Sequence, residues 1–215
     1  MLRRGALIVL EGCDRVGKTT HTKLLVEALK EEGLKVESLR FPDRSTLIGN
    51  ICGKYLEGSE ELEDHAIHLM FSANRWELVP KMLRLLNSGV NLIVDRYAYS
   101  GVAFSYAKKG LNFSWCKQSD VGLPKPDIVL FLDLSSEEMI KRSGFGDERY
   151  EKEDFQNEVK KVYGLLREDN WKIINVEKEE AEVHEEMKKI VKETINNITS
   201  TTCDTLWTDN FETYV

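Results

Sequence analysis

Residues 12–19, Gly-Cys-Asp-Arg-Val-Gly-Lys-Thr, match the pattern GxxxxGK[ST], which suits phosphate binding. The apolar run Ala6–Leu10 before it predicts a strand, and a segment with helical periodicity follows it. The glycines allow a tight turn whose backbone amides face inward, and the helix N-terminus adds partial positive charge. Lys18 would then reach the β- and γ-phosphates of a nucleoside triphosphate, and the Thr19 hydroxyl could bind Mg²⁺. The loop residues expected at the nucleotide are Gly12, Asp14, Arg15, Val16, Gly17, Lys18, Thr19 and Thr20.

Two further arginines follow predicted strands. Arg44 comes after the second strand, in Phe41-Pro42-Asp43-Arg44, and Arg96 comes directly after Asp95 at the end of the third. Ligands of open α/β sheets bind at the carboxyl ends of the strands, so both arginines could face the same crevice as Lys18. Asp95 ends the apolar run "LIV" as a Walker-B acid does, where it would hold Mg²⁺ directly or through water. The alternative is an Asp95–Arg96 ion pair that only caps the strand.

Phe71 and Arg75 stand four residues apart in "HLMFSANRW", on a predicted helix, and therefore share one face. An aromatic ring and a forked donor on one face could bind a flat polar ring, by stacking and by hydrogen bonding. Taken alone, the pair is better explained as a core phenylalanine and a surface arginine. Only the surrounding motifs favour the binding interpretation.

Short apolar runs alternate with helical segments along the chain. The expected strands are Ala6–Leu10, Val36–Phe41, Asn91–Val94, Ile128–Leu132 and Lys172–Val176. Nearly continuous apolar strands predict a doubly wound α/β sheet of about five parallel strands, in one domain spanning residues 1–215. We expect the helical segment 61–88 to be split or kinked near Pro80, giving two helices in series. We also expect a mobile surface loop at 143–149, a solvated helix at 177–192, and a tail after Cys203 whose aromatic residues pack on the body.

Composition limits the possible partners. A formal charge of −7 over 215 residues argues against a nucleic-acid groove but permits an anionic small molecule held by a few converging arginines. The four cysteines have no metal-binding or disulfide spacing and are expected to be reduced thiols. No apolar run is long enough to span a bilayer, and the basic start passes straight into a strand. We expect a soluble cytoplasmic protein that binds no membrane, with nuclear or other intracellular pools not excluded.

Five motifs, taken together and in order, resemble thymidylate kinases of the eukaryotic type: "RGALIVLEG.DR.GKTT", "FPDRS..IG", "MFSANRWE", "DRYAYSGVAFS" and "GLPKPDIVLFLDL". The resemblance covers nearly the whole chain up to Trp207. It implies a P-loop kinase fold with a short lid at about 142–152, and ATP-dependent, Mg²⁺-assisted phosphorylation of dTMP to dTDP in dTTP synthesis. It also implies a homodimer formed through the helices that follow the second and third strands.

The resemblance also assigns roles to individual residues. Phe71 would stack on thymine and Arg75 would hydrogen-bond its exocyclic oxygen, while Arg44 and Arg96 would hold the dTMP phosphate. Asp14 would accept a hydrogen bond from the 3′-hydroxyl, and Arg15 would face the transferred phosphoryl group, a role that bacterial relatives give to a lid arginine. The acceptor pocket would further include Phe41, Tyr97, Ser100, Phe104 and Tyr150, and the nucleotide site would include Arg142 and Lys178, with Arg149 a further lid candidate. The catalytic set would be Arg15, Lys18, Asp95 and Arg96, and the metal ligands Thr19 and Asp95.

Three alternatives remain at this point. A GTPase is disfavoured, because the chain lacks an N/T-K-x-D motif after a late strand. Another nucleoside or nucleotide kinase would share the phosphate loop and the acid-arginine pair, although Arg44 favours a monophosphate acceptor. A catalytically inactive ATP-binding module would keep the fold. For Asp14 and Arg15 themselves, the alternative to a role at the substrates is a local surface ion pair of little energetic value.

Overall fold

Five parallel strands form one sheet in the computed structural model, which describes residues 3–142, 146 and 148–208. The strand order is β2-β3-β1-β4-β5. The strands are β1 (Leu7–Glu11), β2 (Val36–Arg40), β3 (Asn91–Asp95), β4 (Ile128–Asp133) and β5 (Trp171–Asn175). From β1 the chain goes first to β2 and β3 on one side and later to β4 and β5 on the other. This order creates a topological switch point at the carboxyl end of β1, where the phosphate loop begins.

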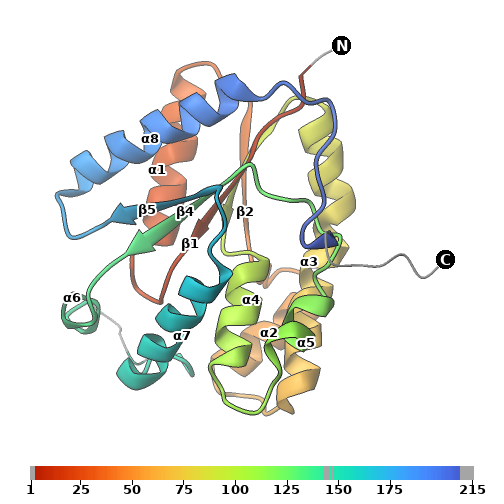
Figure 1. The fold of residues 1–215 in the computed structure, drawn as a ribbon, viewed down its shortest axis with the longest axis vertical. Helices are drawn as coiled ribbons and strands as arrows, with labels where there is room; N and C mark the ends of the chain where they lie inside the picture. The colour runs from red at the N-terminus through yellow and green to blue at the C-terminus, as the bar shows by residue number, and fades with distance from the viewer. Residues whose placement is uncertain (1–2, 143–145, 147, 209–215) are drawn as a thin grey trace.

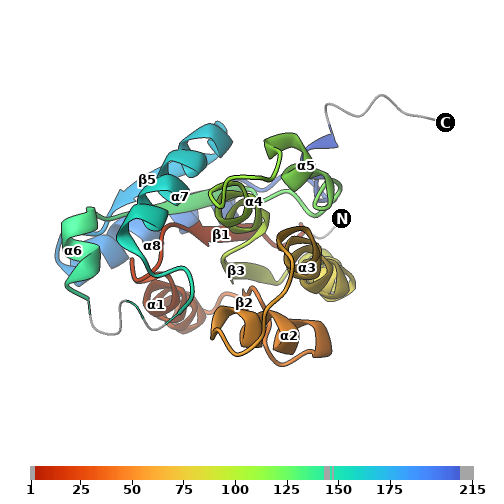
Figure 2. The ribbon, with the colours of Figure 1, turned by 90° about the horizontal axis from the view of Figure 1, so that it is seen from below.

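Eight helices surround the sheet within the described ranges. They are α1 (Lys18–Glu31), α2 (Leu47–Leu56), α3 (Asp64–Asn87), α4 (Ala98–Tyr106), α5 (Phe113–Gln118), α6 (Ser136–Ile140), α7 (Glu153–Leu166) and α8 (Glu180–Asn197). Helices α1 and α8 cover one face of the sheet, and α3, α4 and α7 cover the other (Figures 1 and 2). The three central strands are therefore buried on both faces, which explains their continuous apolar sequences. The predicted doubly wound sheet is confirmed.

The predicted strand ends differ from the observed ones by about one residue. The clearest case is β1, which ends at Glu11 and not at Leu10, because the fully buried Glu11 carboxylate is satisfied by hydrogen bonds. Charged residues likewise end β3 and β4. A prediction that ends each strand at its last apolar residue therefore leaves out these charged terminal residues.

The prediction of two helices in series is wrong, because α3 is one helix of 24 residues that contains Pro80. Proline removes only one donor from the helical ladder. Ile67 before Pro80, and Met82 and Leu86 after it, are completely buried, so packing on the rest of the protein holds both halves in line.

The predicted tail and the predicted mobile loop lie only partly within the described residues. Leu206 is buried, and Trp207 packs edge-on against Tyr99 at 5.5 Å between ring centroids, as expected for a tail that packs its apolar residues on the body. Phe211 lies outside the described residues, as do 143–145 and 147 of the expected mobile loop. Helix α8 has an exposed charged face, and Val183, Met187 and Val191 form its buried one.

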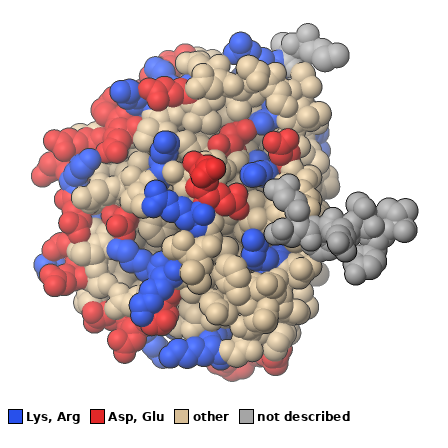
Figure 3. All heavy atoms as spheres, viewed as in Figure 1, with Lys and Arg blue, Asp and Glu red and all other residues tan. Residues whose placement is uncertain are grey.

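All four cysteines are free thiols, and three of them are buried. Among the helices described here, none combines the length and the apolarity that a bilayer crossing requires. On the face seen in Figure 3, acidic and basic side chains are interspersed among uncharged ones.

Candidate active site

A cavity of about 460 Å³ opens at the carboxyl ends of the strands. Most of the residues singled out from the sequence line it, although they come from six separate segments of the chain. They are Asp14, Arg15, Gly17, Lys18, Thr19, Thr20, Phe41, Arg44, Phe71, Arg75, Asp95, Arg96, Tyr97, Ser100, Phe104, Arg142 and Tyr150. Gly12 and Val16 lie within the loop itself, and Lys178 does not line the cavity.

The phosphate loop has the geometry that its glycines predict. Gly12 and Gly17 have φ angles of 146° and 94°, which side chains rarely allow. A Cβ atom on Gly12 would also lie 2.6 Å from the Leu132 carbonyl oxygen. The loop ends at Lys18, the first residue of α1, so the helix N-terminus faces the cavity.

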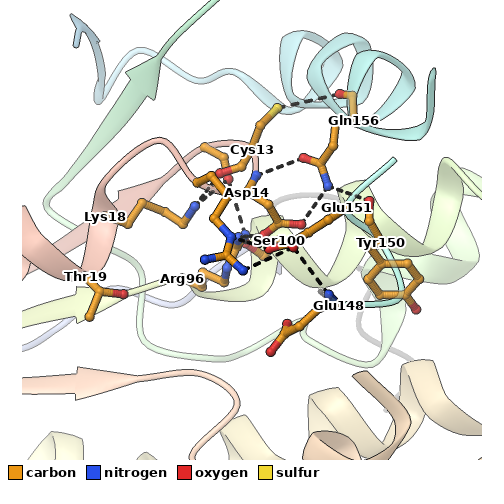
Figure 4. Close-up of polar contacts among 12 residues, drawn as sticks. Cys13, Asp14, Lys18, Thr19, Arg96, Ser100, Glu148, Tyr150, Glu151 and Gln156 are labelled. Atoms are coloured by element: carbon orange, nitrogen blue, oxygen red, sulfur yellow. Dashed lines mark hydrogen bonds and ion pairs between the residues drawn. The ribbon is translucent and has the colours of Figure 1, made fainter. Parts of the chain in front are cut away.

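Lys18 points back into its own loop. Its ammonium donates hydrogen bonds to the Gly12 and Cys13 carbonyl oxygens, as Figure 4 shows. Burial, together with the positive charge of Arg96, lowers the pKa of Lys18 to about 8. The loop therefore holds a cation in an environment that disfavours its charge, and an anionic ligand would relieve this cost.

Thr19 and Asp95 meet at the start of α1. The Thr19 hydroxyl donates to Asp95 Oδ2 at 2.6 Å, and the Asp95 side chain is only 3% exposed. Arg40 Nε lies 3.7 Å from the same carboxylate oxygen. A hydroxyl and a carboxylate oxygen thus face each other beside the phosphate loop.

Asp14 links the phosphate loop to the residue that follows β3. Its carboxylate forms an ion pair with Arg96 and accepts a hydrogen bond from Gln156 Nε2 at 2.6 Å (Figure 4). Arg96 also donates to the Gly12 carbonyl oxygen at 3.2 Å and to Ser100 Oγ at 3.1 Å, and its guanidinium lies 5.1 Å from the centre of the Phe104 ring. Arg96 therefore pairs with the phosphate loop, and not with Asp95 as the strand-capping alternative requires.

Glu11, the last residue of β1, holds the residues that follow Arg96 in place. The sequence did not single it out. Its fully buried carboxylate accepts hydrogen bonds from the backbone N–H groups of Tyr97 and Ser100, at 2.9 and 3.0 Å, and from the hydroxyls of Ser100 and Tyr163. It thereby caps α4, for which the residue before the helix provides no side-chain cap. Burial raises the pKa of Glu11.

Two acidic residues of the predicted lid pair with arginines of the cavity. Glu151 forms a bidentate ion pair with Arg15, and Glu148 contacts Arg44 Nη2 at 2.6 Å. Both acids line the cavity, and neither was singled out from the sequence. Each of the two arginines expected to bind a phosphate thus pairs with a carboxylate of the protein.

Gln156 is a further contact between α7 and the loop that sequence reasoning missed. Its side-chain amide exchanges hydrogen bonds with Asp14 and also donates to the Tyr150 carbonyl oxygen at 2.9 Å. A glutamine on an otherwise amphipathic helix gives no signal that would separate it from a surface residue.

Arg75 is buried, so the surface role that the Phe71–Arg75 pair favoured when taken alone is wrong. Its side chain is 3% exposed, lines the cavity and forms a bidentate ion pair with Asp120 at 2.9 and 2.6 Å. Phe71, one turn earlier, is half-buried and lines the same cavity. An aromatic ring and a donor fork therefore face one space, as their spacing predicts.

The remaining nucleotide candidates differ in position. Arg142 lies over the phosphate loop, where Nη1 donates to the Arg15 carbonyl oxygen at 3.0 Å. Arg149 packs away from the cavity, with its guanidinium 4.1 Å from the centre of the Tyr55 ring and in an ion pair with Glu61. Lys178 pairs with Glu186 on the surface. Only Arg142 of the three lines the cavity.

Comparisons with known proteins agree with this geometry. The family model for thymidylate kinase matches residues 10–187. Thymidylate kinase of Homo sapiens is 50% identical over 208 residues, covering 95% of this chain and 98% of its own length. The Danio rerio enzyme is 49% identical with the same coverage. The solved structure of Candida albicans thymidylate kinase superposes with a TM-score of 0.87, at 38% identity, and covers 96% of this chain and all of its own. The chain belongs to the thymidylate kinase family.

Proposed function

We propose that this protein transfers the γ-phosphoryl group of ATP to dTMP, giving ADP and dTDP for dTTP synthesis. The observation that carries the proposal is that one cavity is lined by a phosphate loop and by a second set of arginines. Lys18 and Thr19 suit the donor, and Arg44 and Arg96 suit an acceptor that is itself a phosphate. A nucleoside acceptor would need no second set of phosphate-binding arginines.

The acceptor would occupy the half of the cavity between α3 and α4. Phe71 offers a face for stacking on thymine, and Arg75 offers donors to a ring oxygen. Arg44 and Arg96 would take the phosphate in place of Glu148 and Asp14. Five further lining residues would contact the acceptor: Phe41, Tyr97, Ser100, Phe104 and Tyr150. Asp14, released from Arg96, would accept a hydrogen bond from the 3′-hydroxyl.

The donor would bind along the phosphate loop, residues 12–20, beneath Arg142. Thr19 and Asp95 fit a Mg²⁺ ion, because their hydroxyl and carboxylate oxygens are the ligand types that this ion prefers and lie 2.6 Å apart beside the loop. Bound there with ATP, the ion would offset charge on the β- and γ-phosphates. A contact between Lys18 and those phosphates would replace its bonds to the loop carbonyls. Lys178 lies outside the cavity, so its adenine contact stays a prediction.

Phosphoryl transfer needs no nucleophilic side chain, because a phosphate oxygen of dTMP attacks the γ-phosphorus and ADP leaves. Catalysis is then mainly alignment of two anions and stabilisation of charge on the transferred group. Lys18, Arg15 and Arg96 all line the cavity and would supply that stabilisation. Arg15 belongs to the donor loop itself, and its guanidinium would exchange Glu151 for the γ-phosphate.

A substrate panel tests this proposal. Purified protein with ATP and Mg²⁺ is assayed for ADP formation with dTMP, dUMP, AMP, GMP and thymidine. We expect the highest kcat/KM with dTMP. Activity confined to thymidine, or ATP turnover that does not depend on any acceptor, would replace the proposal by a nucleoside kinase or an ATP-binding module.

We further infer a homodimer. Helix α3 exposes Leu69, Trp76 and Leu83 at seven-residue intervals, hence on one face, and Leu47 at the start of the adjoining α2 is 83% exposed. Helix α4, which follows the third strand, is largely buried within the chain, so α2 and α3 offer the better surface. Light scattering coupled to size-exclusion chromatography should give about twice the mass of one chain, and Leu69→Glu should shift it toward the monomer.

A further inference from the structure

The Arg75–Asp120 ion pair lies beneath the end of the cavity proposed for the base. Arg75 Nε and Nη2 donate to the two Asp120 oxygens at 2.9 and 2.6 Å, and the two side chains are 3% and 0% exposed. Two parallel bonds fix the plane of the guanidinium as well as its position. Asp120 follows α5 and has no place in the catalytic or binding sets derived above.

Other residues restrain both members of the ion pair. Ser72 Oγ donates to Asp120 Oδ1 at 2.8 Å, which supports the carboxylate from α3. On α4, a Cβ atom added to Gly101 would lie only 2.6 Å from Arg75 Nη2, so the guanidinium packs directly on the glycine backbone. Arg75 therefore has one available orientation, and Asp120 determines it.

The remaining guanidinium nitrogen determines what the pocket can accept. Arg75 Nη1 has no hydrogen-bond acceptor among the described residues, and Arg75 lines the cavity. A guanidinium carries donors and no acceptor, and it stays protonated at any physiological pH. It can pair with a ring carbonyl oxygen, but it opposes an exocyclic amine, which also presents N–H groups.

We propose that Asp120 is a positioning residue that makes the acceptor pocket selective for bases with a carbonyl oxygen at this point, such as thymine and uracil, over cytosine with its amine. The inference rests on the proposed function and adds the residue that enforces base choice. If Asp120 is changed, the guanidinium gains alternative orientations and can turn away from an incoming amine. The preference between bases should therefore change more than kcat does, because Arg75 would contact the base and not the transferred phosphoryl group.

Asp120→Asn tests the proposal, because it keeps one acceptor oxygen and the side-chain shape but removes the second acceptor and the charge. We expect KM for dTMP to rise at least about tenfold, equivalent to one strong hydrogen bond, with kcat within about threefold. The ratio of kcat/KM for dTMP over dCMP should fall at least about tenfold. Ser72→Ala is the matched control: it removes a bond to Asp120 but leaves both bonds to Arg75, so the ratio should stay within about threefold.

A second variant acts on the same guanidinium from the other side. Gly101→Ala must displace Arg75 Nη2, and it should lower the dTMP-to-dCMP ratio without touching Asp120. Thermal unfolding and binding of a fluorescent ATP analogue verify that each variant is folded. The proposal is overturned if Asp120→Asn folds and keeps both the wild-type KM for dTMP and the wild-type dTMP-to-dCMP ratio. If Asp120→Asn does not fold, an unchanged dTMP-to-dCMP ratio in Gly101→Ala overturns it. Wild-type activity with dTMP is measured first, so a failure of the proposed function is recognised separately.

Discussion

Arg15 in the phosphate loop and Glu151 before α7 form a bidentate ion pair, with Nε donating to Oε1 at 2.6 Å and Nη2 to Oε2 at 3.2 Å. Glu151 also accepts hydrogen bonds from the N–H groups of Gly146 and Glu148, so its carboxylate organises the described part of the lid around the loop arginine. The arginine proposed to face the transferred phosphoryl group is thus held by a carboxylate in the protein alone. An incoming phosphate must compete with Glu151 for it.

Weakening this ion pair should strengthen donor binding. In Glu151→Gln the amide oxygen can still accept from the lid backbone, but the charge that competes with phosphate is gone. The pair is partly exposed, with 32% of the Arg15 side chain accessible, so its loss should be worth at most about 1 kcal/mol, or roughly fivefold in Kd for ATP. Titration with a fluorescent ATP analogue measures this, and weaker binding than wild type would contradict competition. Glu158→Gln is the control, because it removes a partly exposed acid of α7 that pairs with Lys161.

Arg15→Ala should lower kcat far more than it weakens acceptor binding. An arginine aimed at developing charge contributes roughly 10³- to 10⁵-fold in rate, whereas Arg44 and Arg96 remain to hold the acceptor phosphate. Steady-state kinetics give kcat, and isothermal titration gives Kd for dTMP, which should stay within about threefold of wild type. Full kcat in this variant would remove Arg15 from the mechanism.

Donor binding should weaken as the pH rises above about 8. Burial, followed by the charge of Arg96, lowers the pKa of Lys18 to about 8, so the unliganded protein loses this positive charge near that pH. Phosphate pairs with the protonated form, so Kd for ATP should rise by up to about tenfold per pH unit until the pKa in the complex is reached. The Lys18→Arg variant, whose guanidinium stays protonated, should show a flatter profile between pH 7 and 9.5. Equal slopes would exclude Lys18 as the titrating group.

The lowered pKa of Lys18 also makes the free energy of unfolding depend on pH. Between pH 8 and the ordinary lysine value of 10.5, the unfolded chain binds a proton at this position that the folded chain has lost. The Lys18 contribution to the free energy of unfolding therefore increases with pH across this window. Urea unfolding of wild type and Lys18→Met measures this at pH 8 and pH 10. Between these two pH values, the free energy of unfolding of wild type should increase relative to that of Lys18→Met.

Removing the Glu11 carboxylate should damage both stability and acceptor binding. Glu11→Ala leaves the buried N–H groups of Tyr97 and Ser100 without acceptors, which costs about 2 to 4 kcal/mol in the free energy of unfolding. KM for dTMP should rise, because Arg96 and Ser100 lose their support. Tyr163→Phe removes one of the four bonds to Glu11 and should have a smaller effect on both quantities. Similar stability of Glu11→Ala and wild type in chemical denaturation would contradict this role.

Much of the site could be predicted from the sequence, because its residues follow strands of one parallel sheet. The carboxyl ends of β1, β2 and β3 lie side by side, so the residues after each strand must converge. This brings Lys18, Arg44 and Arg96 to one cavity. Their roles toward bound nucleotides remain proposals.

The supporting residues could not be found in the same way. Glu11, Asp120 and Gln156 are polar side chains that are buried only because partners from distant segments satisfy them. A single sequence does not contain those pairings, and isolated acids and amides are most often on the surface. At Pro80 the sequence does contain a local helix-breaking signal, but tertiary packing of α3 outweighs it and the helix continues.

The most direct test follows the phosphorus atom itself. The protein is incubated with Mg²⁺, unlabelled dTMP and ATP labelled with ³²P in the γ-phosphate, and the products are separated by chromatography. Phosphoryl transfer between the two half-sites predicts label in dTDP in amounts equal to the ADP formed. Label that appears only in inorganic phosphate, or no loss of label from ATP, would contradict the account.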